Sequence, residues 1–144
     1  KGCWIIFATI FLIAALLAVQ ASAAMVWKTA NSITVAWDPV TTLSDGSPLP
    51  AGSTIQYQLY VRTDPSGTPV ASGNPVTTGT QATVTFTAEG SYDIGVKAQR
   101  MVGGAVVQES QIQWSNDAAA TQGGQTFGAV YYLSPAAVRN LRAP

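Results

Sequence analysis

The residue types that most enzymes use for proton transfer and nucleophilic attack are nearly missing from this sequence. It contains no histidine, which removes the commonest general base, the Ser-His-Asp and Cys-His arrangements, and histidine metal sites. Its one cysteine, Cys3, lies inside an apolar N-terminal segment. The remainder of the chain can therefore form neither a disulfide nor a thiolate metal site.

Carboxylates remain as candidate catalytic or metal-binding groups. They are Asp38, Asp45, Asp64, Glu89, Asp93, Glu109 and Asp117. Catalysis by paired carboxylates needs two acids in one cleft, whereas these are scattered over predicted loops and strand faces. Asp45-Gly46-Ser47 lacks the alternating oxygen donors of a calcium loop and predicts a turn. We therefore expect no enzymatic activity, no metal site and no cofactor.

Contact with a partner is the chemistry that the other side chains could support. Tyr60 and Trp27 could offer flat apolar surface to a sugar ring or a protein, although an isolated exposed tyrosine is also ordinary. A loop predicted over residues 100–107 carries apolar side chains that suit a protein contact. The candidate binding surface consists of Tyr60, Arg100, Met101, Val102 and Val106.

The elements that would position these residues follow from an apolar pattern of period two. From Met25 onward, alternating runs recur between clusters of Gly, Pro, Asn and Asp, and no repeat of period 3.6 persists. The predicted inward side chains are Ile33, Val35, Trp37, Ile55, Tyr57, Leu59, Val61, Ala82, Val84, Phe86, Tyr92, Ile94, Val96 and Ala98. The predicted outward side chains are Gln56, Gln58, Tyr60, Arg62, Asp93, Lys97 and Gln99.

Four further segments complete the predicted strand set. A first strand is expected near Met25 to Thr29, an irregular edge over Thr68 to Gly79, a hairpin or loop tip at Gly103-Gly104, and a last strand over Gln108 to Ser115. The total is about seven short strands, which is the number in an immunoglobulin-like sandwich.

The charge content argues against nucleic acid and for an extracellular location. Seven basic residues balance seven acidic ones and form no run, so the electrostatic footprint that phosphate backbones require is missing. Charged residues make up 10% of the chain, against a usual figure of about 25%. This composition is typical of an extracellular β protein.

The N-terminus has the pattern of an export signal. An uncharged apolar run from Trp4 to Val19 is followed by Ala21-Ser22-Ala23, whose small side chains predict cleavage before Ala24. Residues 1–23 are therefore interpreted as a signal peptide, and the mature protein as secreted, periplasmic or attached to the cell surface. The alternative is an uncleaved anchor helix, which would be the only membrane contact.

Three sets of residues resemble the fibronectin type III family. Trp37 resembles the buried tryptophan of that family's second strand, and Tyr57-x-Leu59 resembles a signature of its third strand. Phe86 lies six residues before Tyr92, the spacing found at the start of the family's sixth strand. The resemblance covers about two thirds of the chain, and the sequence is similar to small secreted bacterial members of the family.

The resemblance implies an all-β fold, a seven-stranded fibronectin type III sandwich over residues 25–117. Tyr92 would form the tyrosine corner, in which the hydroxyl bonds back to the chain a few residues upstream. Family members often place binding residues in the loop between the last two strands, where residues 100–107 lie. The structural core would consist of Trp37, Tyr57, Leu59, Phe86, Tyr92, Ile94 and Val96.

Residues 118–144 have the composition of a linker-like tail, with an extra strand predicted at 126–133. That strand could pack on its own domain or add to the sheet edge of a neighbour, giving self-association through the tail.

We expect a non-catalytic extracytoplasmic binding or adhesion module that contacts a protein or a glycan. The alternative is a structural subunit of a surface assembly or filament that retains its N-terminal helix.

Overall fold

The computed structural model describes residues 25–65, 67–76, 79–137, 139–140 and 142. The predicted signal peptide or anchor helix at 1–23 lies outside the described residues. Within these described ranges, no helix has the length and apolar character that crossing a bilayer requires.

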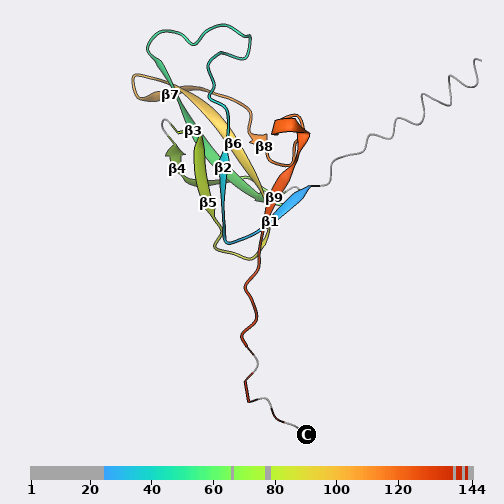
Figure 1. Cartoon of the computed structure of the whole chain (residues 1–144). Helices are drawn as coiled ribbons and strands as arrows, with labels where there is room; N and C mark the ends of the chain where they lie inside the picture. Colours follow the sequence, from blue (N-terminus) through green and yellow to red (C-terminus); the bar gives the residue numbers. More distant parts are fainter. Residues whose placement is uncertain (1–24, 66, 77–78, 138, 141, 143–144) are drawn as a thin grey trace, which may run out of the picture.

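The described chain is an all-β protein, as the alternating pattern predicts (Figure 1). Its strands are β1 (Val26–Thr29), β2 (Ser32–Ala36), β3 (Ser53–Thr63), β4 (Val70–Val76), β5 (Gln81–Thr85), β6 (Gly90–Val102), β7 (Ala105–Glu109), β8 (Gln113–Trp114) and β9 (Phe127–Tyr131). A short 3-10 helix, η1 (Gln122–Gly124), precedes β9.

The strands form two sheets. The larger follows the order β1-β9-β6-β3-β4, with β7 and β8 also paired to β6, and the smaller contains β2 and β5 alone. The two longest strands, β3 and β6, run antiparallel in register from Ser53↔Val102 to Thr63↔Tyr92. They form the rigid centre of the larger sheet.

A single core lies between the two sheets. The smaller sheet and the residue after it contribute Ile33, Val35, Val84 and Phe86, and the larger contributes Leu59, Ile94 and Ala129. All but Ala129 belong to the predicted inward set, so the alternation identifies the buried faces correctly. Burial of such side chains stabilises the fold by roughly 1.5–3 kcal/mol each.

Two aromatic pairs join the sheets at the predicted signature residues. Trp37, which follows β2, meets Tyr57 of β3 edge to face with ring centroids 5.2 Å apart. Phe86, which follows β5, stacks on Tyr92 of β6 at 4.6 Å. The Tyr92 hydroxyl donates a hydrogen bond of 2.7 Å to the carbonyl of Ala88, four residues upstream, which is the contact predicted for it.

Three predictions of outward, solvent-facing side chains are wrong. Gln58, Asp93 and Gln99 lie on the outer face of the larger sheet, as their positions require, but are only 7%, 0% and 9% exposed. Gln58 donates to the carbonyls of Ser72 and Gly73 in the neighbouring strand β4. A period of two assigns a residue to a face, whereas neighbouring side chains decide whether solvent reaches that face.

Two strand predictions also need correction. The last strand predicted at Gln108 to Ser115 is interrupted, because β7 ends at Glu109 and β8 covers only two residues. Most of the loop predicted over residues 100–107 is strand, since β6 continues to Val102 and β7 begins at Ala105, and the hairpin tip predicted at Gly103-Gly104 is confirmed. The irregular edge predicted over Thr68 to Gly79 agrees with β4, which lies at the edge of the larger sheet and shifts register against β3 between Tyr57 and Leu59.

The extra strand predicted at 126–133 is present as β9 and packs on its own domain. It pairs antiparallel with β6, placing Ala129 opposite Tyr92, and parallel with β1, placing Phe127 opposite Val26. Strands β7, β8 and β9 thus pair with successive stretches of β6 along one edge. The larger sheet therefore extends beyond residue 117, the end of the predicted sandwich.

Candidate binding surface

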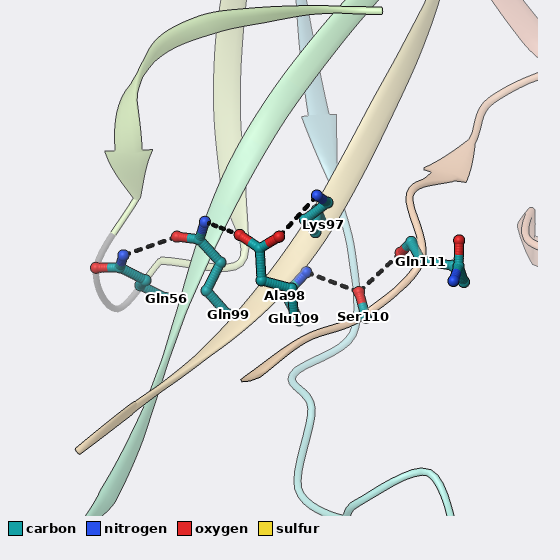
Figure 2. Close-up of polar contacts among 7 residues, drawn as sticks. All are labelled: Gln56, Lys97, Ala98, Gln99, Glu109, Ser110 and Gln111. Carbon is teal, nitrogen blue, oxygen red and sulfur yellow. Dashed lines mark hydrogen bonds and ion pairs between the residues drawn. The ribbon is translucent and has the colours of Figure 1, made fainter. Parts of the chain in front are cut away.

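A ladder of polar side chains crosses the outer face of the larger sheet (Figure 2). Gln56 of β3 donates to Gln99 of β6 at 2.8 Å, and Gln99 donates to Glu109 of β7 at 2.6 Å. Lys97 completes the ladder with an ion pair of 2.9 Å to the second oxygen of Glu109. The ladder ties three neighbouring strands together.

The two ionisable members of the ladder, Lys97 and Glu109, are both charged at neutral pH. The hydrogen bond to Glu109 raises the pKa of Lys97, and the hydrogen bond from Lys97 lowers the pKa of Glu109. Both groups lie near solvent, so their contribution to stability is small. Their effect is to fix the register of β7 against β6.

Where β7 leaves the sheet, Ser110 holds it to β6 (Figure 2). The backbone N–H of Ala98 donates to the Ser110 hydroxyl at 3.0 Å, and that hydroxyl donates to the carbonyl of Gln111 at 2.7 Å. At the interruption between β7 and β8, the Ser110 hydroxyl thus takes the place of a backbone carbonyl as the acceptor for the N–H of Ala98.

A second polar cluster surrounds Asp93. One carboxylate oxygen, Oδ2, accepts hydrogen bonds from Arg62 at 3.2 Å and from Asn116 at 2.8 Å. The other oxygen, Oδ1, is buried with no hydrogen-bond partner in the described chain. Burial raises the pKa of Asp93, because the loss of solvent outweighs the stabilisation that Arg62 gives the charged form. The nearby carboxylate of Asp64 raises the pKa of Asp93 further.

Trp114 lies flat over Gly95 within this face. A Cβ atom on Gly95 would approach the Trp114 ring to 2.9 Å and Ile112 to 2.5 Å, so only glycine leaves room for the indole. The Arg62 guanidinium lies 4.0 Å from the Trp114 ring centroid on a cation–π contact.

The aromatic rings proposed for sugar stacking are only partly free. Lys97 lies over Tyr60, 5.4 Å from its centroid, and Tyr60 is half-buried. Trp27 is 37% exposed and lies over Gly128, where an added Cβ would approach the indole to 2.6 Å. Of the two, Trp27 therefore offers an accessible indole, and no continuous aromatic platform joins it to Tyr60 in the described chain.

One exposed apolar feature is the tip of the β6–β7 hairpin. Val102, Val106 and Val107 are 44%, 45% and 45% exposed. The turn at Gly103 and Gly104 has φ angles of 59° and 83°, which suit the two-residue turns that match strand twist. We define the hairpin tip as residues 101–107; no charged side chain lies between Met101 and Gln108.

The candidate surface residues are thus divided among three places. Met101, Val102 and Val106 all belong to the hairpin tip, where Met101 pairs with Val106 on one face and Val102, the next residue of β6, points to the other. Arg100 faces away from Met101, opposite Ile55 on the inward side of the sheet. Tyr60 pairs with Gly95 farther along β6 and belongs to the polar outer face.

Sequence reasoning missed the polar ladder and the Arg62–Trp114 contact. The ladder has a signal in retrospect, since Gln56, Gln99 and Glu109 share one row of the sheet. Finding it requires the register of three strands, which local patterns leave open. Among the described residues, no group of three or more potential metal ligands gathers at one place.

The chain matches no protein-family model, no curated protein and no solved structure in comparisons with known proteins.

Proposed function

We propose that the protein is a non-catalytic binding module of the periplasm or cell exterior whose hairpin tip contacts a protein partner. The observation that carries the proposal is the exposure of Val102, Val106 and Val107 on a tip that has no charged side chain. Exposed apolar side chains on a rigid projection are typical of a contact surface, because their contact with water is unfavourable in free energy. Burial against a partner removes that contact.

The scaffold below the tip supports this role. The polar ladder and Ser110 hold β7 against β6, and the two-glycine turn leaves no long flexible loop. A preorganised tip loses little conformational entropy on binding, so a small apolar surface can contribute usefully to affinity.

A protein partner fits the surface better than a glycan. Lys97 covers Tyr60 and Arg62 covers Trp114, which leaves Trp27 as the exposed indole on the outer face. The valines of the hairpin tip lack the hydrogen-bonding groups that sugar recognition uses.

Membership in the fibronectin type III family is part of the proposal. Supporting it are the hydrogen bond from Tyr92 to Ala88 and the packing of Trp37 on Tyr57. Also in favour are the pairing of β2 with β5 in one sheet and of β3 with β6 and β7 in the other, which matches the B–E and C–F–G pairing of immunoglobulin-like sandwiches. Export is supported by the apolar N-terminal run and the small residues before Ala24.

The alternative of a structural subunit joined through the tail has less support. Strand β9 lies between β6 and β1 in its own sheet, so neither of its edges is open to a neighbour.

Photo-crosslinking from the hairpin tip tests the proposal. A photoreactive residue at Val106 should trap one discrete protein in the surface or periplasmic fraction of the producing cells. The same residue at Thr85, an exposed position on β5, is the matched control and should trap none. Equal products from both positions, or none from Val106, would refute a contact at the tip.

A further inference from the structure

Arg100 is a cation on the inward face of the larger sheet. It continues the inward series of β6 after Ala98 and pairs with Ile55 of β3. At this end of the sandwich the smaller sheet has ended, since β2 stops at Ala36, and the loop between β2 and β3 takes its place beside the hairpin (Figure 1).

The charge of Arg100 is uncompensated. No Asp or Glu side chain of the described chain lies within ion-pair distance of it. Its Nε is buried without a hydrogen-bond partner, and its one hydrogen bond, from Nη1 to the Ser53 hydroxyl, is long at 3.4 Å. An arginine stays charged at all relevant pH values, so this fork has donors to offer an anion.

The two carboxylates that line the same cavity as Arg100, Asp45 and Glu109, have hydrogen-bond partners of their own. Asp45 accepts hydrogen bonds from the Ser47 N–H at 2.9 Å and the Ser47 hydroxyl at 2.6 Å. Glu109 is held by Lys97 and Gln99.

Arg100 lines a cavity of about 340 Å³ between the β2–β3 loop and β7. Apolar walls come from Val40, Leu43, Leu49, Ile55 and Ala98, and hydroxyls from Thr42, Ser44 and Ser110. Mostly apolar walls with a few polar groups are typical of small-molecule sites, and the volume is at the small end of their range of roughly 300–1,000 Å³.

We propose that this cavity binds a carboxylate carried on a small apolar body, with Arg100 pairing with the carboxylate and Leu43, Leu49 and Ile55 contacting the body. Such a group occurs in a free small carboxylic acid and in the C-terminal residue of a polypeptide. This site is distinct from the hairpin tip and stands whether or not the tip binds a protein.

The surroundings favour a single negative charge. Asp45 and Glu109 also line the cavity. Hydrogen bonds with Ser47 lower the pKa of Asp45, and the hydrogen bond from Lys97 lowers the pKa of Glu109, so both stay ionised, and Lys97 pairs with the charge of Glu109. A dianion such as phosphate would be repelled by these carboxylates more strongly than a monoanion. The planar fork of Arg100 matches the two oxygens of a carboxylate.

Titration calorimetry of the purified full chain tests the site with N-acetyl-leucine and its uncharged amide as probes. The acid should bind, and the amide should bind about ten- to a hundred-fold more weakly, because hydrogen bonds to a charged partner are lost. An Arg100→Gln variant should have an affinity for the acid that is lower by a similar factor. Arg139→Gln, at an exposed arginine of the tail, should bind the acid as the unaltered chain does.

A Val40→Trp variant, which fills the cavity and keeps Arg100, separates binding from folding. It should abolish binding while its far-ultraviolet spectrum and Tm remain those of the parent. A tripeptide ending in leucine identifies the source: tighter binding than N-acetyl-leucine indicates a polypeptide C-terminus, and equal binding indicates a free acid. No binding of either acid at 10 mM, a ligand concentration about ten times the ~1 mM Kd of a weak site, would overturn the proposal. Equal binding of acid and amide, or unchanged binding by Arg100→Gln, would also overturn it.

Discussion

At the scale of residues, the stability of this protein depends on single hydrogen bonds and single carboxylates. The hydrogen bond of Tyr92 is the first example. Its hydroxyl bonds to the Ala88 carbonyl on a site that solvent reaches. Tyr92→Phe should therefore lower the free energy of unfolding by only about 0.5–1.5 kcal/mol, the net value of one hydrogen bond. Urea unfolding measures this loss. The control Tyr132→Phe, at a ring that is 60% exposed, should change nothing; equal losses in both variants would contradict a special role for Tyr92.

Asp93 gives a prediction about pH. Burial raises its pKa in the folded state, so the folded protein binds this proton more tightly than the unfolded chain does. Stability from this group is therefore gained as pH falls through the folded-state pKa and is complete below the unfolded value. Because Glu109 has the opposite shift, the parent is compared with Asp93→Asn, whose amide cannot titrate.

The stability difference between the parent and Asp93→Asn is measured by urea unfolding at pH 7 and at a pH near 3.8, the ordinary pKa of an aspartate side chain. The parent should gain on the variant as pH falls. A difference that is constant, or that moves the other way, would show that the burial of Asp93 has no electrostatic consequence.

Residue faces could be predicted from the sequence, and residue burial on the outer face could not. Alternation assigns Asp93 and Gln99 to the outer face correctly, but both are buried there. The partners that cover them are Asn116, in the turn after β8, and Glu109, at the end of β7. Whether these partners lie next to Asp93 and Gln99 depends on strand register and on strand interruptions, which no local pattern specifies.

At the scale of elements, the short strand β8 depends on a glycine in its neighbour. Gly95→Ala should destabilise the protein by about 1–3 kcal/mol, the usual cost of overpacking, because its Cβ would lie 2.9 Å from the Trp114 ring. A double-mutant cycle with Trp114→Ala should show a coupling above about 0.5 kcal/mol, with the glycine substitution costing less once the indole is gone. Strict additivity would mean that the two residues do not meet.

Strand β9 gives the second prediction at this scale. Ending the chain after residue 117 removes Ala129, which is fully buried in the core, and leaves β1 without its partner. The shortened protein should unfold at a Tm at least about 4–8 °C lower, which corresponds to a loss of 1 kcal/mol or more in a domain of this size. A chain ending after residue 133 retains β9 and is the control; equal Tm values for the two would show that β9 adds nothing.

The strand at 126–133 could be predicted from its apolar content, but its place could not. Its partner β1 lies about a hundred residues earlier in the chain, and pairing at that distance leaves no mark on local periodicity. Likewise, the residues of the hairpin tip could be proposed as a surface, whereas the separation of Arg100 from Met101 onto opposite faces required the sheet.

For the whole molecule, the central claim is that two sheets close on one interior and thereby hold both the hairpin tip and the cavity beside it. In each of the two aromatic pairs, Trp37 with Tyr57 and Phe86 with Tyr92, one ring comes from each sheet. Phe86 lies only six residues before Tyr92, whereas Trp37 and Tyr57 are separated by the long loop between β2 and β3, so the contact of Trp37 with Tyr57 is the one that most requires the sheets to face each other.

Nuclear Overhauser spectroscopy of the aromatic protons tests this claim most directly. Ring centroids at 5.2 Å and 4.6 Å should give strong cross-peaks within both pairs, and urea should abolish the two sets together. A folded protein in which either pair gives no cross-peak would contradict the two-sheet interior and every proposal that depends on it.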